Sequence, residues 1–216
     1  MKRSRIALPA FVLMLAACTA PVPAQDGPTA GSAGTSAGSP SATAARAALP
    51  AGRYELTTAS GAQITFTLPT PATDPAVAAI EAYRVKVEAA PVSYLVADVD
   101  NRAGTVPVNM YVVSAFSEDG RQFTFSGVAD AIQGWAPTYS YDYKWSMGGK
   151  ALDEAVGAEL KREANDLYNA ELSDVDTGER TTVVLASSDA VLPTEFAKVA
   201  VQPSGSGDEE EARPAR

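Results

Sequence analysis

The chain has 216 residues, of which 26 are acidic, 17 are basic and none is histidine, giving a net charge of −9. Phosphate backbones repel such an anionic surface, so we expect no nucleic-acid partner. The lack of histidine excludes Ser-His-Asp and Cys-His catalysis and removes the commonest metal ligand, and no cofactor fingerprint is present.

Residues 1–17 have the pattern of a secretory signal peptide. Three basic residues precede an apolar run about half as long as the roughly 20 residues needed to span a bilayer. The run ends in Leu15-Ala16-Ala17-Cys18, which resembles the lipobox of bacterial lipoproteins. That resemblance implies cleavage before Cys18 and attachment of a diacylglycerol to its sulfur. Loss of the three basic residues would bring the mature chain from −9 to −12.

A lipid on Cys18 would hold the chain on the extracytoplasmic face of the cell membrane. Each buried methylene contributes about 0.8 kcal/mol, and two acyl chains anchor stably where one does not. Thr19 follows Cys18, and the family's sorting rule then favours the outer membrane in a cell that has one. The alternative is an ordinary signal peptide with a coincidental cysteine, although Cys18 is the only cysteine in the chain.

Two segments are predicted to be disordered. Residues 18–50 are mostly Ala, Gly, Ser, Thr and Pro, and so few large apolar side chains predict a flexible tether. Residues 204–216, which include the acidic run Asp208–Glu211, are predicted to be a solvated tail. Residues 51–203 remain as one domain, and a chain of about 150 residues can bury a substantial core.

Short segments of alternating polarity dominate this domain. Ile64, Phe66 and Leu68 recur at period two after a turn at Ser60-Gly61, which predicts a hairpin with the preceding segment. Similar segments follow at 92–100, 108–116, 123–125, 181–185 and 196–201. Many short strands separated by turn signals predict a mainly β fold, an immunoglobulin-like antiparallel β-sandwich.

Two helices interrupt the strands. Asp74-Pro75 offers an N-cap and a first-turn proline for a short helix over about 75–83. The second helix is predicted over about 150–172, where leucine, valine and alanine recur every three to four residues between charged ones. Its apolar stripe is expected to pack on the sandwich, and docking into a partner's groove is the alternative.

Several strand segments together resemble the telokin-like immunoglobulin domain found in many bacterial lipoproteins. They are Tyr94–Asn101, Pro107-Val108, Glu118–Phe123, Gly178–Leu185 and Leu192-Pro193. The resemblance covers about half of the domain, and the predicted long helix is an insertion relative to it. It implies a sandwich fold and supplies no catalytic residues, and fold alone does not determine function.

The most unusual local feature is a run of aromatic residues: Trp135, Tyr139, Tyr141, Tyr143 and Trp145. If residues 139–145 are extended, the last four share one face of a strand. Aromatic rings with polar handles can stack on sugars or receive a peptide, so these residues are the candidate ligand-binding site. The alternative is that they face the core or lie under the long helix.

Alternating acidic residues after the second helix are weak candidates for a calcium site. Asp174, Asp176 and Glu179 surround a glycine, as oxygen-rich calcium loops prefer. The segment lacks the distal glutamate and the glycine register of an EF-hand, so an acidic turn is the alternative. Asp98 and Asp100 form a weaker pair.

These observations favour a lipid-anchored envelope protein that presents a non-catalytic binding or adaptor domain to an envelope protein or a polysaccharide. One alternative is a hydrolase that uses two carboxylates on envelope sugars. Another is a passive structural lipoprotein. The sequence leaves the ligand, the envelope type and the oligomeric state open.

Overall fold

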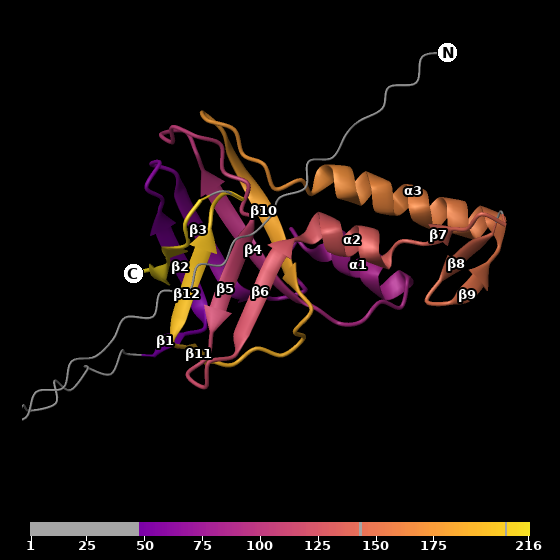
Figure 1. Ribbon diagram of the computed structural model, residues 1–216, viewed down its shortest axis with the longest axis horizontal. Coiled ribbons are helices and arrows are strands. Elements are labelled where there is room, and N and C mark those ends of the chain that lie inside the picture. The colour runs from indigo at the N-terminus through magenta and orange to yellow at the C-terminus, as the bar shows by residue number, and fades with distance from the viewer. Residues whose placement is uncertain (1–47, 143, 206) are drawn as a thin grey trace, which may run out of the picture. The chain divides into compact units, whose positions relative to one another are not determined.

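A computed structural model describes residues 48–142, 144–205 and 207–216, and Figure 1 draws their helices and strands. The predicted signal peptide, Cys18 and the predicted tether up to residue 47 lie outside the described residues. So does Tyr143, one of the five candidate aromatic residues.

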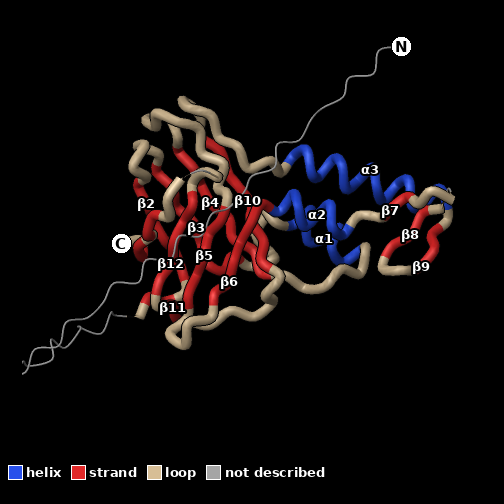
Figure 2. The backbone as a smooth tube through the Cα atoms, viewed as in Figure 1, coloured by secondary structure: helices blue, strands red, loops and turns tan. Residues whose placement is uncertain are grey.

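Most of the strands form one antiparallel sheet with the order β13-β12-β5-β6-β10-β4-β3-β2-β14. Figure 2 shows these strands gathered on one side of the helices. Their bounds are β2 Gly52–Thr57, β3 Gln63–Thr70, β4 Ser93–Asp100, β5 Val112–Phe116, β6 Gln122–Gly127, β10 Arg180–Ser187, β12 Lys198–Gln202, β13 Glu210–Glu211 and β14 Arg213–Pro214. A separate pair is formed by β1, Leu49–Pro50, and β11, Glu195–Phe196.

The first hairpin is confirmed. Strands β2 and β3 pair from Gly52↔Leu68 to Thr57↔Gln63 around the predicted turn. Ile64, Phe66 and Leu68 are buried, whereas the residues between them are half-buried. The alternation therefore assigns one face of this hairpin to the core.

The sheet is nearly closed by the C-terminal segment. β13 pairs with β12 at one end of the strand order, and β14 pairs with β2 at the other. Ala212, which lies between β13 and β14, is fully buried, and its N–H donates to the Val199 carbonyl at 2.9 Å. A short strand segment thus joins the two edges, and pairing both edges protects backbone groups that an open sheet exposes.

This closure corrects two predictions. The two-sheet immunoglobulin-like sandwich is wrong, because the strands form a nearly closed, barrel-shaped sheet in which β10 lies between β4 and β6. Residues 210–214 are not a solvated tail, since they supply strands to that sheet. Alternating polarity is the same in both architectures, and it does not specify which strands become neighbours.

The predicted tether also extends too far, because β1 pairs with β11 from Leu49.

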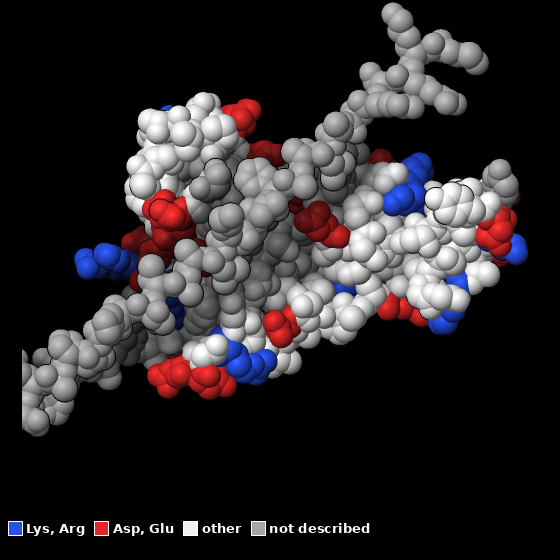
Figure 3. Space-filling model, viewed as in Figure 1, with Lys and Arg blue, Asp and Glu red and all other residues white. Residues whose placement is uncertain are grey.

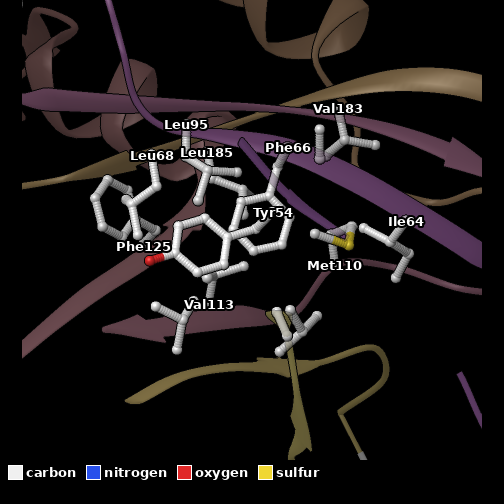
Figure 4. Close-up of a cluster of buried hydrophobic side chains, with 14 of the residues drawn as sticks. Tyr54, Ile64, Phe66, Leu68, Leu95, Met110, Val113, Phe125, Val183 and Leu185 are labelled. Atoms are coloured by element: carbon white, nitrogen blue, oxygen red, sulfur yellow. The ribbon is translucent and has the colours of Figure 1, made fainter. Parts of the chain in front are cut away.

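Side chains fill the interior of the sheet. Figure 4 shows ten labelled members pointing toward one another, with Tyr54 and Phe66 near the centre. Their rings stack with centroids 5.6 Å apart. The Tyr54 hydroxyl donates to the Pro50 carbonyl at 2.7 Å, and burial raises the pKa of Tyr54 to about 12. The interior is a packed core, as expected for a small closed sheet.

Three helices form a second apolar cluster with the outer face of the sheet. They are α1 Ala78–Lys86, α2 Val128–Trp135 and α3 Glu154–Ala170. The cluster joins their buried residues to Tyr94 of β4 and to Val184 and Ala186 of β10. The two predicted helices, about 75–83 and about 150–172, are confirmed with shifted ends. Helix α2 was not predicted, because eight residues give only two turns of apolar periodicity. Among the described residues, no helix is long and apolar enough to cross a membrane.

Candidate binding site: an aromatic hairpin on the long helix

The aromatic run folds into a small antiparallel sheet and not into one extended strand. β7, Thr138–Tyr139, pairs with β8, Trp145–Met147, and β8 pairs with β9, Lys150–Leu152. Figure 1 shows this sheet beside the N-terminal end of α3. Tyr139 and Trp145 lie on different strands, so the single extended strand on which the shared aromatic face depended is not formed.

Local turn chemistry explains the reversal. The Ser140 N–H donates to the Lys144 carbonyl at 2.9 Å, and the Ser140 hydroxyl donates to the Asp142 carboxylate. Lys144 Nζ also lies 3.2 Å from an Asp142 oxygen. The Ser140 hydrogen bond, followed by that from Lys144, lowers the pKa of Asp142. Serine and aspartate often stabilise turns through such short-range hydrogen bonds.

The hairpin brings two of the candidate residues together and leaves a third fully exposed. Tyr139 is directly opposite Trp145 in the register, with ring centroids 4.7 Å apart and planes tilted by 50°. Tyr139 is 50% exposed and Tyr141 is fully exposed, whereas Trp145 is half-buried. We call Tyr139, Tyr141 and Trp145 the aromatic tip. Trp135 is partly buried at the end of α2, where it packs against the helical cluster.

A glycine within α3 seats the aromatic tip on the helix. A Cβ atom at Gly157 would lie 2.3 Å from Trp145 Cγ, far inside van der Waals contact. Gly157 is buried, and glycine in a helix interior costs about 1 kcal/mol relative to alanine. Close approach of Trp145 accounts for glycine at this position. A glycine inside a predicted amphipathic helix is the one sequence signal that could have located this contact.

The apolar stripe of α3 is occupied within the chain. Leu160 and Ala164 are buried in the helical cluster, and the Tyr83 hydroxyl of α1 donates to the Leu160 carbonyl at 3.2 Å. Lys161 of α3 donates to the Gln133 side chain of α2 at 2.8 Å. The stripe therefore packs chiefly against α1 and α2, and through them on β4 and β10.

The weak calcium candidates do not converge. Val175, between Asp174 and Asp176, is fully buried, and its N–H and carbonyl bond the Val108 backbone at 2.7 and 3.0 Å. Asp174, Asp176 and Glu179 are all exposed. Across the part of the chain that is described, no three acidic or cysteine side chains are grouped as a metal site requires.

The second acidic pair is engaged by arginines. Asp98 accepts from Arg180 at 2.9 Å, and Asp100 accepts from Arg102 at 2.9 Å. The hydrogen bond from Arg102 lowers the pKa of Asp100 to about 2. These carboxylates are therefore partners of guanidinium groups on the sheet surface.

The aromatic tip is the best candidate site that the structure offers for the predicted binding role. It combines flat apolar faces with phenolic hydroxyls, and its charged turn residues Asp142 and Lys144 pair with each other. Figure 3 shows acidic and basic groups scattered over one face of the molecule, without a continuous basic patch. A comparison of the chain with protein-family models, with curated proteins and with solved structures finds no match.

Proposed function

We propose that the chain is a lipid-anchored envelope protein whose domain binds a neutral polysaccharide of the cell envelope through the aromatic tip. The observation that carries the proposal is the exposure of Tyr141 and Tyr139 on a hairpin that α3 supports. The Tyr139 ring also lies against Trp145. A sugar ring presents C–H groups that pack on an aromatic face and hydroxyls that bond a phenol.

Charge favours a neutral polymer over an anionic one. The chain carries a net charge of −9, so an acidic polysaccharide would be repelled at long range. The tip itself contributes no net charge, because Asp142 and Lys144 neutralise each other. An envelope protein with an exposed apolar groove is the alternative partner.

Attachment to the membrane rests on the sequence. The lipobox-like Leu15-Ala16-Ala17-Cys18 and the absence of any other cysteine support a diacylglycerol on Cys18. Mass spectrometry of the native protein should find a processed, acylated Cys18 as the first residue. A Cys18→Ser chain should be released from membranes, and equal release of the wild type would contradict the anchor.

Sedimentation with insoluble cell-wall polysaccharide tests the binding proposal. The full chain with Cys18→Ser should co-sediment, and Tyr141→Ala should weaken binding at least about tenfold, as for an aromatic hot spot. Because Tyr141 is fully exposed, its removal should change the free energy of unfolding by less than about 0.5 kcal/mol.

Two variants serve as controls. Tyr141→Phe keeps the ring and should retain most of the binding if stacking dominates. Val191→Ala removes another exposed apolar side chain outside the hairpin and should bind as the parent chain does. Equal binding by Tyr141→Ala would contradict the proposal, and release of soluble sugar by the parent chain would favour the hydrolase alternative.

A further inference from the structure

A cavity of about 320 Å³ lies where the helical layer joins the sheet. Four separate parts of the chain line it: the approach to β5, the start of α2, the end of α3 and the segment after α3. Tyr111 and Tyr168 are among the lining residues, and Tyr111 is 53% exposed. The volume is at the lower end of the range for small-molecule sites, so the cavity suits a small molecule and not a polymer.

Three side-chain oxygen groups at this cavity, those of Asn109, Asp130 and Asp174, have no hydrogen-bond partner among the described residues. Asn109 Oδ1 is buried without a hydrogen bond, and buried polar atoms in native structures almost always have one. Asp130 and Asp174 are exposed residues at the rim of the same cavity, and within the described ranges neither carboxylate forms a hydrogen bond or an ion pair. No lysine or arginine is among the residues that line the cavity.

The local charges sum to a negative site. The start of α2 contributes about half a positive charge, and its N-cap, Gly127, offers no side-chain cap. The end of α3 contributes about half a negative charge at the same cavity, so the two helix dipoles offset each other. The carboxylates of Asp130 and Asp174 remain, at a cavity that Tyr111 and Tyr168 also line.

The segment that carries Asn109 and Tyr111 is held firmly. Met110, between them, is fully buried in the sheet core and has a φ of 45°, an uncommon conformation for a residue other than glycine. The Asn109 N–H donates to the Pro203 carbonyl at 3.0 Å. The backbones of Val108 and Val175 exchange two hydrogen bonds, one from each N–H to the other's carbonyl. Backbone strain that the surrounding structure maintains is common at binding sites.

We propose that this cavity binds a small organic ammonium ion, with the cation against the faces of Tyr111 and Tyr168 and near the carboxylates of Asp130 and Asp174. Aromatic rings attract such cations through their quadrupole, and unpaired carboxylates add charge attraction. The ammonium group can belong to a free metabolite or to a lipid headgroup. The site is separate from the aromatic tip.

Ligand-observed NMR with choline tests this site, using the full chain with Cys18→Ser. The control ligand is 3,3-dimethyl-1-butanol, which has the shape of choline without its charge. Choline should bind at millimolar concentration and the alcohol should not, and added salt should weaken choline binding. Failure of choline to bind, or equal binding of the alcohol, would overturn the proposal.

Matched variants locate the binding. Tyr111→Ala should weaken choline binding roughly two- to fivefold, the value of one exposed cation–π contact. Asp130→Asn/Asp174→Asn should weaken it further and remove the salt dependence. Asp208→Asn changes an exposed carboxylate outside the cavity, and Tyr141→Ala alters the aromatic tip, so both should bind choline as the parent does. Loss of binding in Asp208→Asn equal to that in the double variant would also overturn the proposal.

Vesicles distinguish the two sources of the ammonium group. The same chain should sediment with phosphatidylcholine vesicles, in a Tyr111-dependent manner, if a headgroup can enter the cavity. Binding of free choline without sedimentation assigns the site to a soluble ligand. Both outcomes support an ammonium site, whereas sedimentation that Tyr111→Ala does not change would count against a headgroup in this cavity.

Discussion

The sheet and the helical layer are stabilised in different ways. Backbone ladders join each strand of the nine-stranded sheet to its neighbours, and apolar side chains fill its interior. The helical layer shares one smaller apolar cluster with the sheet's outer face. Individual side-chain contacts add to it, such as Tyr83 to the Leu160 carbonyl and Lys86 to Glu163 at 2.7 Å.

This difference suggests separate roles: the sheet provides stability, and the helical layer carries the proposed binding sites. The C-terminal segment pairs part of each outer edge of the sheet, so the sheet serves as a rigid support. Both proposed binding sites involve the helical layer, where surface side chains can change without breaking a strand ladder. Binding sites in proteins are often carried in this way by segments that a rigid scaffold positions.

Opening the sheet should have the largest effect. Deleting residues 208–216 removes β13 and β14 and leaves the edges of β12 and β2 unpaired. We expect a loss of roughly 3–5 kcal/mol in the free energy of unfolding, since each backbone hydrogen bond contributes about 1 kcal/mol. Urea denaturation measures the loss, and size-exclusion chromatography should detect association through the exposed edges.

A control separates closure from surface charge. Glu209→Gln breaks only the exposed ion pair with Lys198, at 3.2 Å, and should cost less than about 1 kcal/mol. If the deletion costs no more than Glu209→Gln, the C-terminal segment is not what stabilises the sheet.

A substitution in α3 tests how the aromatic tip is seated. Gly157→Ala should destabilise the chain by about 1–3 kcal/mol, because the new methyl group overlaps Trp145. In a Trp145→Ala background the same change should stabilise by about 0.5–1 kcal/mol, since only the helix preference of alanine remains. Thermal denaturation of the four proteins measures this change of sign, and the same sign in both backgrounds would contradict the contact.

A third test concerns the attachment of α1 to β4. Glu81 accepts from Arg84 Nε at 2.7 Å and from the Tyr94 hydroxyl at 2.9 Å. The Arg84 hydrogen bond is the main cause that lowers the pKa of Glu81. A lowered carboxyl pKa contributes stability above its unfolded value, and this contribution is lost as the pH falls through the folded value.

Removal of this carboxylate should therefore have a pH-dependent cost. Glu81→Gln should lose about 1–2 kcal/mol at pH 7 and progressively less below pH 4.5, the ordinary pKa of a glutamate. Urea titrations over the acid range measure the difference between the two proteins. A cost that does not vary with pH would show that the carboxylate acts through shape alone.

The smallest effect is expected at the end of α3, with the opposite sign. Burial raises the pKa of Glu171, the C-cap residue, where a negative charge also opposes the helix dipole. A raised carboxyl pKa contributes stability below the unfolded value, which is lost as the pH rises through the folded value. Glu171→Gln should therefore stabilise the chain at pH 7 by less than about 1 kcal/mol, and a loss of stability there would contradict this account.

Predictions from local pattern were accurate where contacts are local. The β2–β3 hairpin and helix α3 follow from period-two and three-to-four-residue spacing, which are properties of a single segment. The aromatic run stands out in the sequence, but its turn was missed. The reversal between β7 and β8 was overlooked because aromatic alternation also fits a straight strand.

The cavity between sheet and helices could not have been found in the same way. Tyr111, Asp130 and Asp174 are far apart in the chain, and no spacing rule connects them. They meet only because β5, α2 and the segment after α3 converge in three dimensions.

The sequence by itself determined which segments alternate, which residues have apolar faces to bury, and that histidine chemistry is absent. Only the tertiary structure decided that the sheet closes through residues 210–214, that α3 covers other helices, and that Trp145 rests on Gly157. The physical reason is that side-chain alternation is set by each strand's own geometry, whereas strand order and closure depend on pairings between residues far apart in the chain.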